Sequence, residues 1–573
     1  MASSSTVNKL PFGLEPSQID AMYGIANRAL VQTSHMIWQA NHRADHMATD
    51  PKVGGHPAAC ASSLHLTTAM HMVARAPQDF WCGKPHMAPL DHALHLQLGV
   101  FHNADKSWMS AEDSQTVMNR LRQFSADGSP TFQSYHAAGD PDSWRVLPSG
   151  TVGIPPVNSG YLALTHKYLT DRGLEDKQDV HFWSLLGDSE FREGSLFEAI
   201  TDFGERRLNN VSWILDYNRQ SLDGTRLLNN DAFGGTDADR IHTTMVANGW
   251  NVIELKHGEK RRAVFEETDG ALLKNVFDNL LSDFDFQAML WKRDAKLIRR
   301  EFIALEPKLK PLLKSFDDSK LLEIYQDLGG HNLVDILQAY EQCRNSDKPT
   351  MVLAHTIKGF NMNDFAMAGN HSSLPSEEEI DSMLKSEGLS KDLPYDLIGN
   401  WQADGAQRTF LEQRGQFVRT SIDNEQRRLA AKTASYAELF ATPLPTDFGI
   451  NISMMPIVHT QWMWGQVANK MTRIGAHSDY QNSGVDGLAD LNELEKSWQA
   501  VSELALTLSP DVGTSTNINP SMDGKIYGAS GVRDWETELD WEERGRPELL
   551  DSRNATARLI RFEIAEQAPL SAA

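Results

Sequence analysis

Residues Val180–Gly224 read VHFWSLLGDSEFREGSLFEAITDFGERRLNNVSWILDYNRQSLDG, and this stretch decides the fold. The apolar run Val180–Leu186 is typical of a buried strand, as is a second run, Val211–Tyr217. Between them, apolar residues recur at helical spacing from Leu196 to Phe203. Strand, helix and strand in this order form a right-handed βαβ unit. The sequence therefore predicts an α/β fold with a parallel sheet flanked by helices.

Two polar residues, Asp188 and Asn218, follow the apolar runs at their carboxyl ends, where open α/β sheets bind ligands. A carboxylate and an amide oxygen are hard ligands that suit Mg²⁺. A helix expected after Glu190 would present N–H groups and the positive end of its dipole to an anion. These features fit an Mg²⁺–diphosphate site. Taken alone, they favour a simpler interpretation, an Asp at a strand-to-helix turn and an Asn at a strand end.

The order Gly-Asp-x-Glu, about thirty residues, Asn-x-Gln and then Asp-Gly resembles the thiamine diphosphate signature. It is most similar to the signature of the homodimeric-type pyruvate dehydrogenase E1 component, a relative of transketolase. The resemblance implies that Asp188, Asn218 and the backbone carbonyl of Gln220 hold Mg²⁺. Ser189 stands where the usual motif has Gly and adds a side chain beside the diphosphate. The cofactor contacts implied in this stretch are Asp188, Ser189, Glu190, Asn218, Gln220 and Leu222.

Composition bounds the class of protein. With 573 residues, 40% of them apolar, the chain can bury large cores and is expected to hold two or more domains. A net charge of −23 argues against nucleic acid as the main partner. The three cysteines lack the close spacing of a disulfide framework or a zinc cluster. Because neither an apolar signal core nor a run of transmembrane length occurs, we expect a cytoplasmic protein without a membrane partner.

Two histidine pairs have spacings that metal ligands on a helix can have. His42 and His46 lie at i, i+4 in a helix expected over residues 17–50, a spacing that can ligate zinc. No third ligand is evident, and His92 and His95 present the same ambiguity. We therefore expect exposed or core-edge histidines at both places.

Two other histidine segments resemble the E1 family. Gly54-Gly55-His56-Pro57 is similar to a Gly-Gly-His segment whose histidine faces the cofactor diphosphate and the substrate channel. Ala59 replaces the Ser expected three residues after the His. Lys84-Pro85-His86 is similar to an active-site Gln-x-His, with Lys84 as a cation in place of the amide. The resemblance implies catalytic roles for His56 and His86 and a cofactor contact for Lys84; without it, these would be solvated loop residues.

Three later segments also resemble the family. The loop Ser149–Pro156 is similar to the segment that lies against the aminopyrimidine ring, so we assign a cofactor contact to Val152, with packing alone as the alternative. A strand expected at Met351–Ala354 runs into His355-Thr356-Ile357-Lys358-Gly359, where the family's Lys reaches the cofactor region. His371 lies at the distance of the family's mobile loop, which implies that it orients substrate and transfers protons.

The domain organisation follows the same resemblance. Residues 1–440 are expected to form the diphosphate-binding domain, with a helical insert near 260–345, and residues 441–450 a linker. Residues 451–573 are expected to begin a second α/β domain, the pyrimidine-binding domain. There a strand expected at Leu559–Ile564 runs into Glu566, which by resemblance hydrogen-bonds the aminopyrimidine and activates the cofactor. Without the resemblance, Glu566 would be a surface residue near a terminus.

By resemblance, the rest of the pyrimidine domain and a C-terminal domain are absent from the chain. A two-strand fragment would leave open sheet edges, which proteins normally cover. We therefore expect a second subunit that completes the fold, with two such pairs assembling as α2β2.

The resemblance implies an alpha-type subunit of a thiamine diphosphate-dependent 2-oxo acid dehydrogenase. It would decarboxylate pyruvate or a near homologue to a cofactor-bound enamine and pass the acyl unit to a lipoyl-bearing E2 partner. One alternative is a transketolase-like carboligase that joins the same unit to an aldehyde or ketone. Another is a non-catalytic, cofactor-holding subunit, against which Asp188, Asn218 and Glu566 argue.

Overall fold

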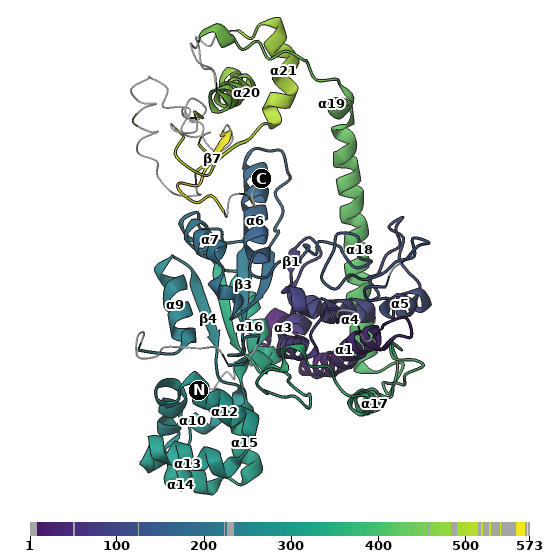
Figure 1. The fold of residues 1–573 in the computed structure, drawn as a ribbon, viewed down its shortest axis with the longest axis vertical. Helices are drawn as coiled ribbons and strands as arrows, with labels where there is room; N and C mark the ends of the chain where they lie inside the picture. The colour runs from purple at the N-terminus through teal and green to yellow at the C-terminus, as the bar shows by residue number, and fades with distance from the viewer. Residues whose placement is uncertain are drawn as a thin grey trace, which may run out of the picture. The chain divides into compact units, whose positions relative to one another are not determined.

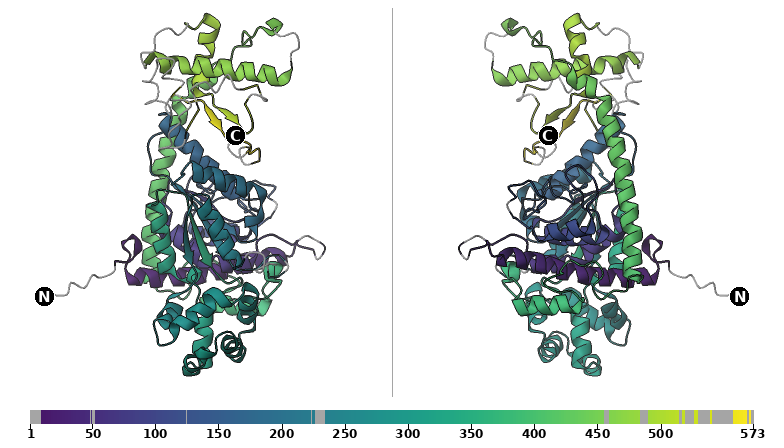
Figure 2. Two further views of the ribbon diagram at one scale, coloured as in Figure 1. Left: turned by 90° about the vertical axis from the view of Figure 1, so that its left-hand side faces the viewer. Right: turned by 90° about the vertical axis from the view of Figure 1, so that its right-hand side faces the viewer.

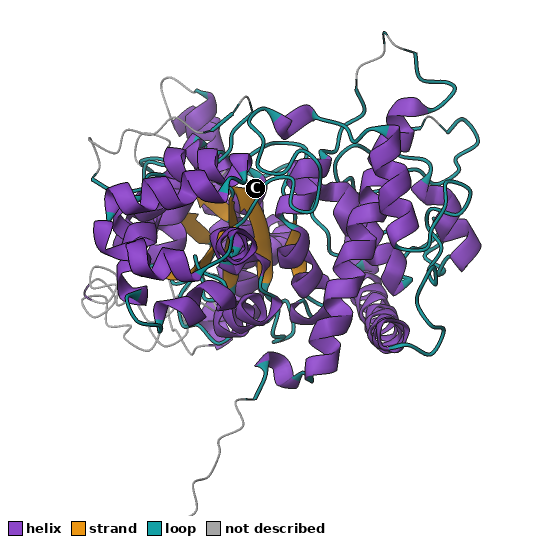
Figure 3. Ribbon diagram, turned by 90° about the horizontal axis from the view of Figure 1, so that it is seen from below, coloured by secondary structure: helices purple, strands orange, loops and turns teal. Residues whose placement is uncertain are grey.

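Five strands form the central sheet, in the order β1-β2-β3-β5-β4. Their bounds are β1 Phe80–Cys82, β2 Phe182–Gly187, β3 Val211–Tyr217, β4 Asn251–Leu255 and β5 Thr350–His355. Every neighbouring pair is parallel. Strands β3 and β5 are buried along their whole length, as expected for a parallel sheet covered on both faces. Helices surround the strands (Figures 1 and 3), so the predicted α/β fold is confirmed.

The computed structural model describes residues 9–47, 49, 52–123, 125–222, 224–225, 234–454, 459–482, 490–513, 517–518, 526–528, 539, 557–567 and 570. Asp223 of the predicted Asp-Gly turn lies outside these residues. Contacts divide the chain into two units. The first comprises Met1–Ser159, Val180–Glu193 and Asn209–Ile422, and the second comprises Gly160–Asp179, Gly194–Leu208 and Asp423–Ala573.

The helices before and around the sheet belong to the first unit. They are α1 Pro16–His42, α2 Pro57–Ser62, α3 Leu64–Ala69, α4 Ala88–Leu98, α5 Ala111–Met118, α9 Asp237–Ala247 and α17 Glu377–Ser386. Helix α1, seen along its length in Figure 2, packs on α4 and ends at His42, because Arg43 is extended. The helix predicted over residues 17–50 is therefore too long at its C-terminal end. Helix α9 packs on β4 and β5.

A helical insert separates β4 from β5, as predicted for residues 260–345. Its helices are α10 Glu259–Phe265, α11 Gly270–Asn275, α12 Asp283–Lys292, α13 Ala295–Leu305, α14 Lys310–Ser315, α15 Asp318–Gln326 and α16 Leu333–Arg344. The insert buries its own apolar core, which includes Leu273, Ile298 and Tyr325. Ile357, just after β5, packs into this core, so the insert is tied to the segment that carries Lys358.

The second unit contains a small parallel pair of strands, β6 Thr507–Ser509 and β7 Leu559–Arg561. Its helices are α7 Gly194–Glu205, α19 Ala437–Ala441, α20 Thr460–Asn482, α21 Glu493–Leu504 and most of α6 Pro155–Asp171, whereas α18 Ala406–Ser435 runs from the first unit into the second. The strand predicted over 559–564 stops at Arg561. No helix among the described residues is long and apolar enough to cross a membrane.

Candidate active site

The two predicted metal ligands lie side by side at the carboxyl ends of β2 and β3. The register pairs Gly187 with Asp216, which brings Asp188 next to the segment that follows β3. The Arg219 N–H donates a 2.7 Å hydrogen bond to Asp188 Oδ2. Asp188 and Asn218 are both buried. The predicted juxtaposition is therefore confirmed, whereas their roles as Mg²⁺ ligands remain predictions.

The turn after β3 is held rigidly around Asn218 and Gln220. Asn218 Oδ1 accepts the Gln220 N–H at 3.0 Å, and the Gln220 side-chain amide donates to the Ala366 carbonyl at 2.9 Å. Between them, Arg219 has a φ of 65°, a left-handed conformation that sharpens the turn. Its guanidinium donates to the Thr356 carbonyl at 2.7 Å. The segments after β3 and β5 are thus fastened together at the edge of the sheet where ligands bind.

A buried ion pair lies next to these ligands. One of its members, Asp216, was not among the predicted site residues. Lys84 pairs with Asp216, and both side chains are almost fully excluded from solvent. Asp216 also accepts hydrogen bonds from Ser62 at 2.7 Å, from Ser63 at 2.8 Å and from Thr356. Lys84 and these hydroxyls overcome the effect of burial and lower the pKa of Asp216. Lys84, predicted as a cofactor contact, is therefore also the counter-ion of a strand carboxylate.

Glu190 is a buried carboxyl beside Asp188. Its Oε2 accepts the Gly187 N–H at 2.7 Å, which closes the turn after β2. Burial raises the pKa of Glu190 to about 7, and the charges of Asp216 and Asp188 add to this effect. The predicted helix does not begin directly after Glu190: a 3-10 helix, Glu190–Arg192, intervenes, and α7 begins at Gly194.

Three histidines predicted from separate segments come together. The ring centroids of His56 and His371 are 4.3 Å apart, those of His56 and His86 4.5 Å, and those of His86 and His371 4.9 Å. The His56 N–H donates to the His86 carbonyl at 3.1 Å, which joins the first two segments. Burial lowers the pKa of His56 to about 2 and that of His86 to about 3, and neighbouring histidines and lysines lower each pKa further. Both rings are therefore neutral near pH 7.

Lys358 joins the histidines to the turn after β3. Its Nζ lies 3.3 Å from His371 Nδ1 and donates to the Ser221 carbonyl at 3.2 Å. Burial lowers the pKa of Lys358 to about 8, and the charge of Lys84 adds to this effect. The ammonium is therefore mostly charged at pH 7 but can lose its proton within the physiological range.

These groups surround a cavity of about 320 Å³. It is lined by Ala59, Lys84, His86, Val152, Gly187, Asp188, Ser189, Glu190, Asn218, Gln220, Ser221, Leu222, Lys358 and His371. Two predicted site residues are not among the lining residues. His56 contacts the rings of His86 and His371, and Glu566 belongs to the second unit. Ala59 and Ser189, two departures from the family pattern, both face this cavity.

The donor set of the cavity fits an Mg²⁺–diphosphate group. Asp188 and Asn218 supply a carboxylate and an amide oxygen, the hard donors that Mg²⁺ prefers. Lys84 and Lys358 bring positive charge to the same wall. Within the described part of the chain, the buried Ser189 Oγ makes no hydrogen bond, so it is available to bond a group held in the cavity.

Glu566 lies just after β7 and is exposed. The preceding Ala565 N–H donates to the Pro510 carbonyl at 3.2 Å, so the segment is fastened to the end of β6. Its predicted role toward the aminopyrimidine remains a prediction.

The remaining histidine predictions divide into one confirmation and one correction. His42 lies on α1, with Nδ1 2.7 Å from the Trp38 carbonyl, and neither it nor His46 belongs to a metal-competent cluster among the described residues. The prediction of exposed or core-edge histidines is confirmed there, because His42 is exposed and His46 is half-buried. His92 and His95 are not at the edge of the core: both are buried, because α4 packs them against a loop carboxylate, Asp142.

Comparisons with known proteins show which proteins the chain resembles. No protein-family model matches the chain. The chain is 28% identical over 372 residues to the pyruvate dehydrogenase E1 component of Mycolicibacterium smegmatis, which covers 63% of this chain and 37% of that protein. It is 27% identical over 395 residues to the one from Cupriavidus necator, covering 67% and 41%. The chain thus spans less than half the length of these relatives.

Solved structures show the same fold. Transketolase from Leishmania mexicana superposes with a TM-score of 0.55 at 16% identity, covering 96% of this chain and 62% of that one. Transketolase from Campylobacter jejuni gives a TM-score of 0.52 at 16% identity, with the same coverage. At this identity the likeness is one of fold alone.

Proposed function

Because the chain belongs to the superfamily of pyruvate dehydrogenase E1 components and transketolases, we propose that it is the alpha-type subunit of a thiamine diphosphate-dependent 2-oxo acid dehydrogenase. One observation carries this proposal. Asp188 and Asn218, at the ends of two strands, meet histidines from segments near residues 86 and 371 around a single cavity.

The chain's own residues would hold the cofactor. Asp188, Asn218 and the carbonyl of Gln220 would bind Mg²⁺, and Lys84 and Lys358 would face the diphosphate. When bound, thiamine diphosphate supplies a nucleophilic carbon and stabilises the negative charge that loss of CO₂ leaves behind. The hydrogen bonds that fasten the turn after β3 keep these ligands in place before the cofactor arrives.

The histidines would handle protons at the substrate. Their depressed pKa values keep His56 and His86 neutral, so each ring carries one N–H donor and one acceptor nitrogen at pH 7. The Lys358 ammonium donates to His371 Nδ1, which leaves Nε2 to carry the proton of that ring. A neutral imidazole in this form can donate a hydrogen bond to a carboxylate or carbonyl oxygen and later exchange its proton.

The pyrimidine side of the site is a further part of the proposal. Glu566 would hydrogen-bond the aminopyrimidine ring and activate the cofactor. The relatives are more than twice as long as the stretch they share with the chain, which supports the need for further polypeptide. We propose that a second subunit supplies it in an α2β2 assembly, and that a lipoyl-bearing E2 accepts the acyl unit.

A transketolase-like carboligase is the second candidate. It is favoured by the departures Ala59, Lys84 and Ser189, all of which line the cavity and change its wall relative to the E1 pattern. The metal ligands proposed for the cofactor, Asp188 and Asn218, are retained.

The test is an assay of the chain co-expressed with the neighbouring open reading frame. CO₂ release from pyruvate and longer 2-oxo acids is measured with thiamine diphosphate and Mg²⁺, then with a lipoyl domain or an aldehyde added. Acylation of the lipoyl domain supports the dehydrogenase, and a hydroxyketone product supports the carboligase. Asp188→Ala serves as the inactive control. A complex that binds the cofactor yet releases no CO₂ and forms no product would refute both, in favour of a cofactor-holding subunit.

A further inference from the structure

A second cluster of ligand-type side chains lies outside the cofactor cavity. His92 on α4 and His136, Asp140 and Asp142 on the following irregular segment each offer a ligand atom, all within 4.8 Å of one another. None of the four lines the cofactor cavity. All are buried, with exposed fractions of 0%, 4%, 1% and 2%. Four charged or titratable groups so far from water require a compensating partner.

Three atoms of this cluster lack such a partner. His92 Nε2, His136 Nδ1 and Asp142 Oδ1 are buried and make no hydrogen bond within the described part of the chain. Buried polar atoms are nearly always hydrogen-bonded, so three orphans on adjacent side chains point to a missing ligand.

In both histidines, a carboxylate holds the other ring nitrogen. His92 Nδ1 lies 2.7 Å from Asp142 Oδ2, and His136 Nε2 lies 2.7 Å from Asp91 Oδ2. An imidazole whose N–H donates to a carboxylate presents the lone pair of its other nitrogen. This is the arrangement of metal-bound histidines, in which the carboxylate fixes the tautomer and the ring orientation.

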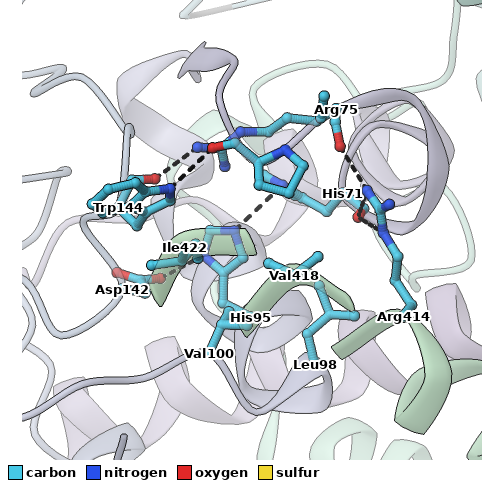
Figure 4. Close-up of a pocket in the computed structure, with 12 residues that line it drawn as sticks. His71, Arg75, His95, Leu98, Val100, Asp142, Trp144, Arg414, Val418 and Ile422 are labelled. Atoms are coloured by element: carbon cyan, nitrogen blue, oxygen red, sulfur yellow. Dashed lines mark hydrogen bonds and ion pairs between the residues drawn. The ribbon is translucent and has the colours of Figure 1, made fainter. Parts of the chain in front are cut away.

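The network around the cluster carries negative charge. Asp142 also accepts from His95 Nδ1 at 2.9 Å, and His95 Nε2 lies 3.3 Å from His71 Nδ1 (Figure 4). His71 in turn reaches Asp91 at 2.6 Å. Among the described residues, the ion pairs of Asp91 and Asp142 are with imidazoles, which are cationic only when protonated. A bound divalent cation would compensate for these buried carboxylates directly.

We propose that His92, His136, Asp140 and Asp142 bind one Zn²⁺ ion, which fastens the segment between Tyr135 and Ser149 onto α4. Two imidazole nitrogens and two carboxylate oxygens suit four-coordinate zinc, whereas Mg²⁺ takes oxygen ligands alone. Because the four residues are buried and no ligand position faces the cofactor cavity, the site is structural. Zinc–ligand distances of about 2.0–2.2 Å would draw the four atoms closer together.

The test is the zinc content of the full chain, purified without a histidine tag from zinc-supplemented cells and measured by mass spectrometry. We expect about one Zn²⁺ per chain after dialysis, and a lower unfolding temperature after treatment with a strong chelator. His92→Gln and Asp140→Asn should lose the ion. Asp91 positions His136 rather than binding the ion, so Asp91→Asn should weaken zinc affinity about 10- to 100-fold.

Two controls separate this site from others. His35→Gln removes a buried histidine whose Nδ1 lies 3.1 Å from the Tyr395 hydroxyl and which is not part of the cluster, and it should keep its zinc. The double variant His56→Gln/His86→Gln disrupts a second metal-competent cluster found among the described residues, and it should also keep its zinc. Co²⁺ substitution in the wild-type chain should give the intense visible absorption of a tetrahedral site, a readout that needs no variant. A zinc-free wild-type chain with only weak affinity for Zn²⁺, or zinc lost in the double variant and retained in His92→Gln, would overturn the proposal.

Discussion

Replacing Lys84 by Met tests the ion pair beneath the cofactor site. The change leaves Asp216 buried without the ammonium that neutralises it, and removing one partner of a buried pair costs about 3–5 kcal/mol. Ser62, Ser63 and Thr356 still donate hydrogen bonds to the carboxylate, so we expect the lower end, about 3 kcal/mol. The measurement is urea unfolding of the cofactor-free chain at pH 8, followed by circular dichroism.

The same experiment has an internal check in its pH dependence. Lys84 contributes to the lowered pKa of Asp216 against the effect of burial, so in Lys84→Met we expect burial to raise that pKa above its unfolded value and the folded state to bind a proton more tightly than the unfolded state. The stability deficit should therefore shrink at pH 5 and grow toward pH 8. Lys84→Met/Asp216→Asn should recover much of the loss. Lys260→Met, which breaks the exposed pair with Glu323, should cost less than about 1 kcal/mol. A deficit below about 1 kcal/mol for Lys84→Met, or no recovery in the double variant, would refute the reasoning.

Three other predictions concern the acid–base groups. Burial raises the pKa of Glu190 to about 7, so the free energy of unfolding should fall as the pH rises from 4.5 to 7. Glu190→Gln should flatten this slope in urea unfolding. Equal slopes in the variant and the wild type would contradict a raised pKa for Glu190. His371→Ala should lower kcat about 10²- to 10⁴-fold with little change in cofactor affinity, and an unaltered kcat would remove it from proton transfer. Glu566→Gln should leave cofactor binding largely intact but slow the exchange of the thiazolium C2 proton followed by NMR, and an unchanged exchange rate would exclude its proposed role.

The sequence predicts the positions of Asp188 and Asn218 because they depend on local patterns. Each follows an apolar run, and parallel strands bring their carboxyl ends to one edge of the sheet. His56, His86 and His371 could be grouped only through a family resemblance, since nothing in their local sequence indicates that they approach one another.

Other features depend on contacts between distant segments. Asp216 is the one charged residue in the apolar run Val211–Tyr217, and only its partners, Lys84 and Ser62, reveal its place in the site. A charged residue in a predicted central strand is the signal that could have found it. His92 was expected to be exposed or at the core edge because no further ligand was evident in the sequence. Its partner Asp142 lies in an irregular segment, where no periodicity indicates that the two residues meet.

The most direct test of the account is calorimetric titration of the full chain with thiamine diphosphate, with and without Mg²⁺. We predict Mg²⁺-dependent binding in the wild-type chain that is lost in Asp188→Ala. Asp335→Asn, which alters a carboxylate paired with Arg262 and absent from the cavity lining, should bind as the wild type does. Undiminished, Mg²⁺-dependent binding by Asp188→Ala would contradict the central claim that Val180–Gly224 forms the diphosphate site.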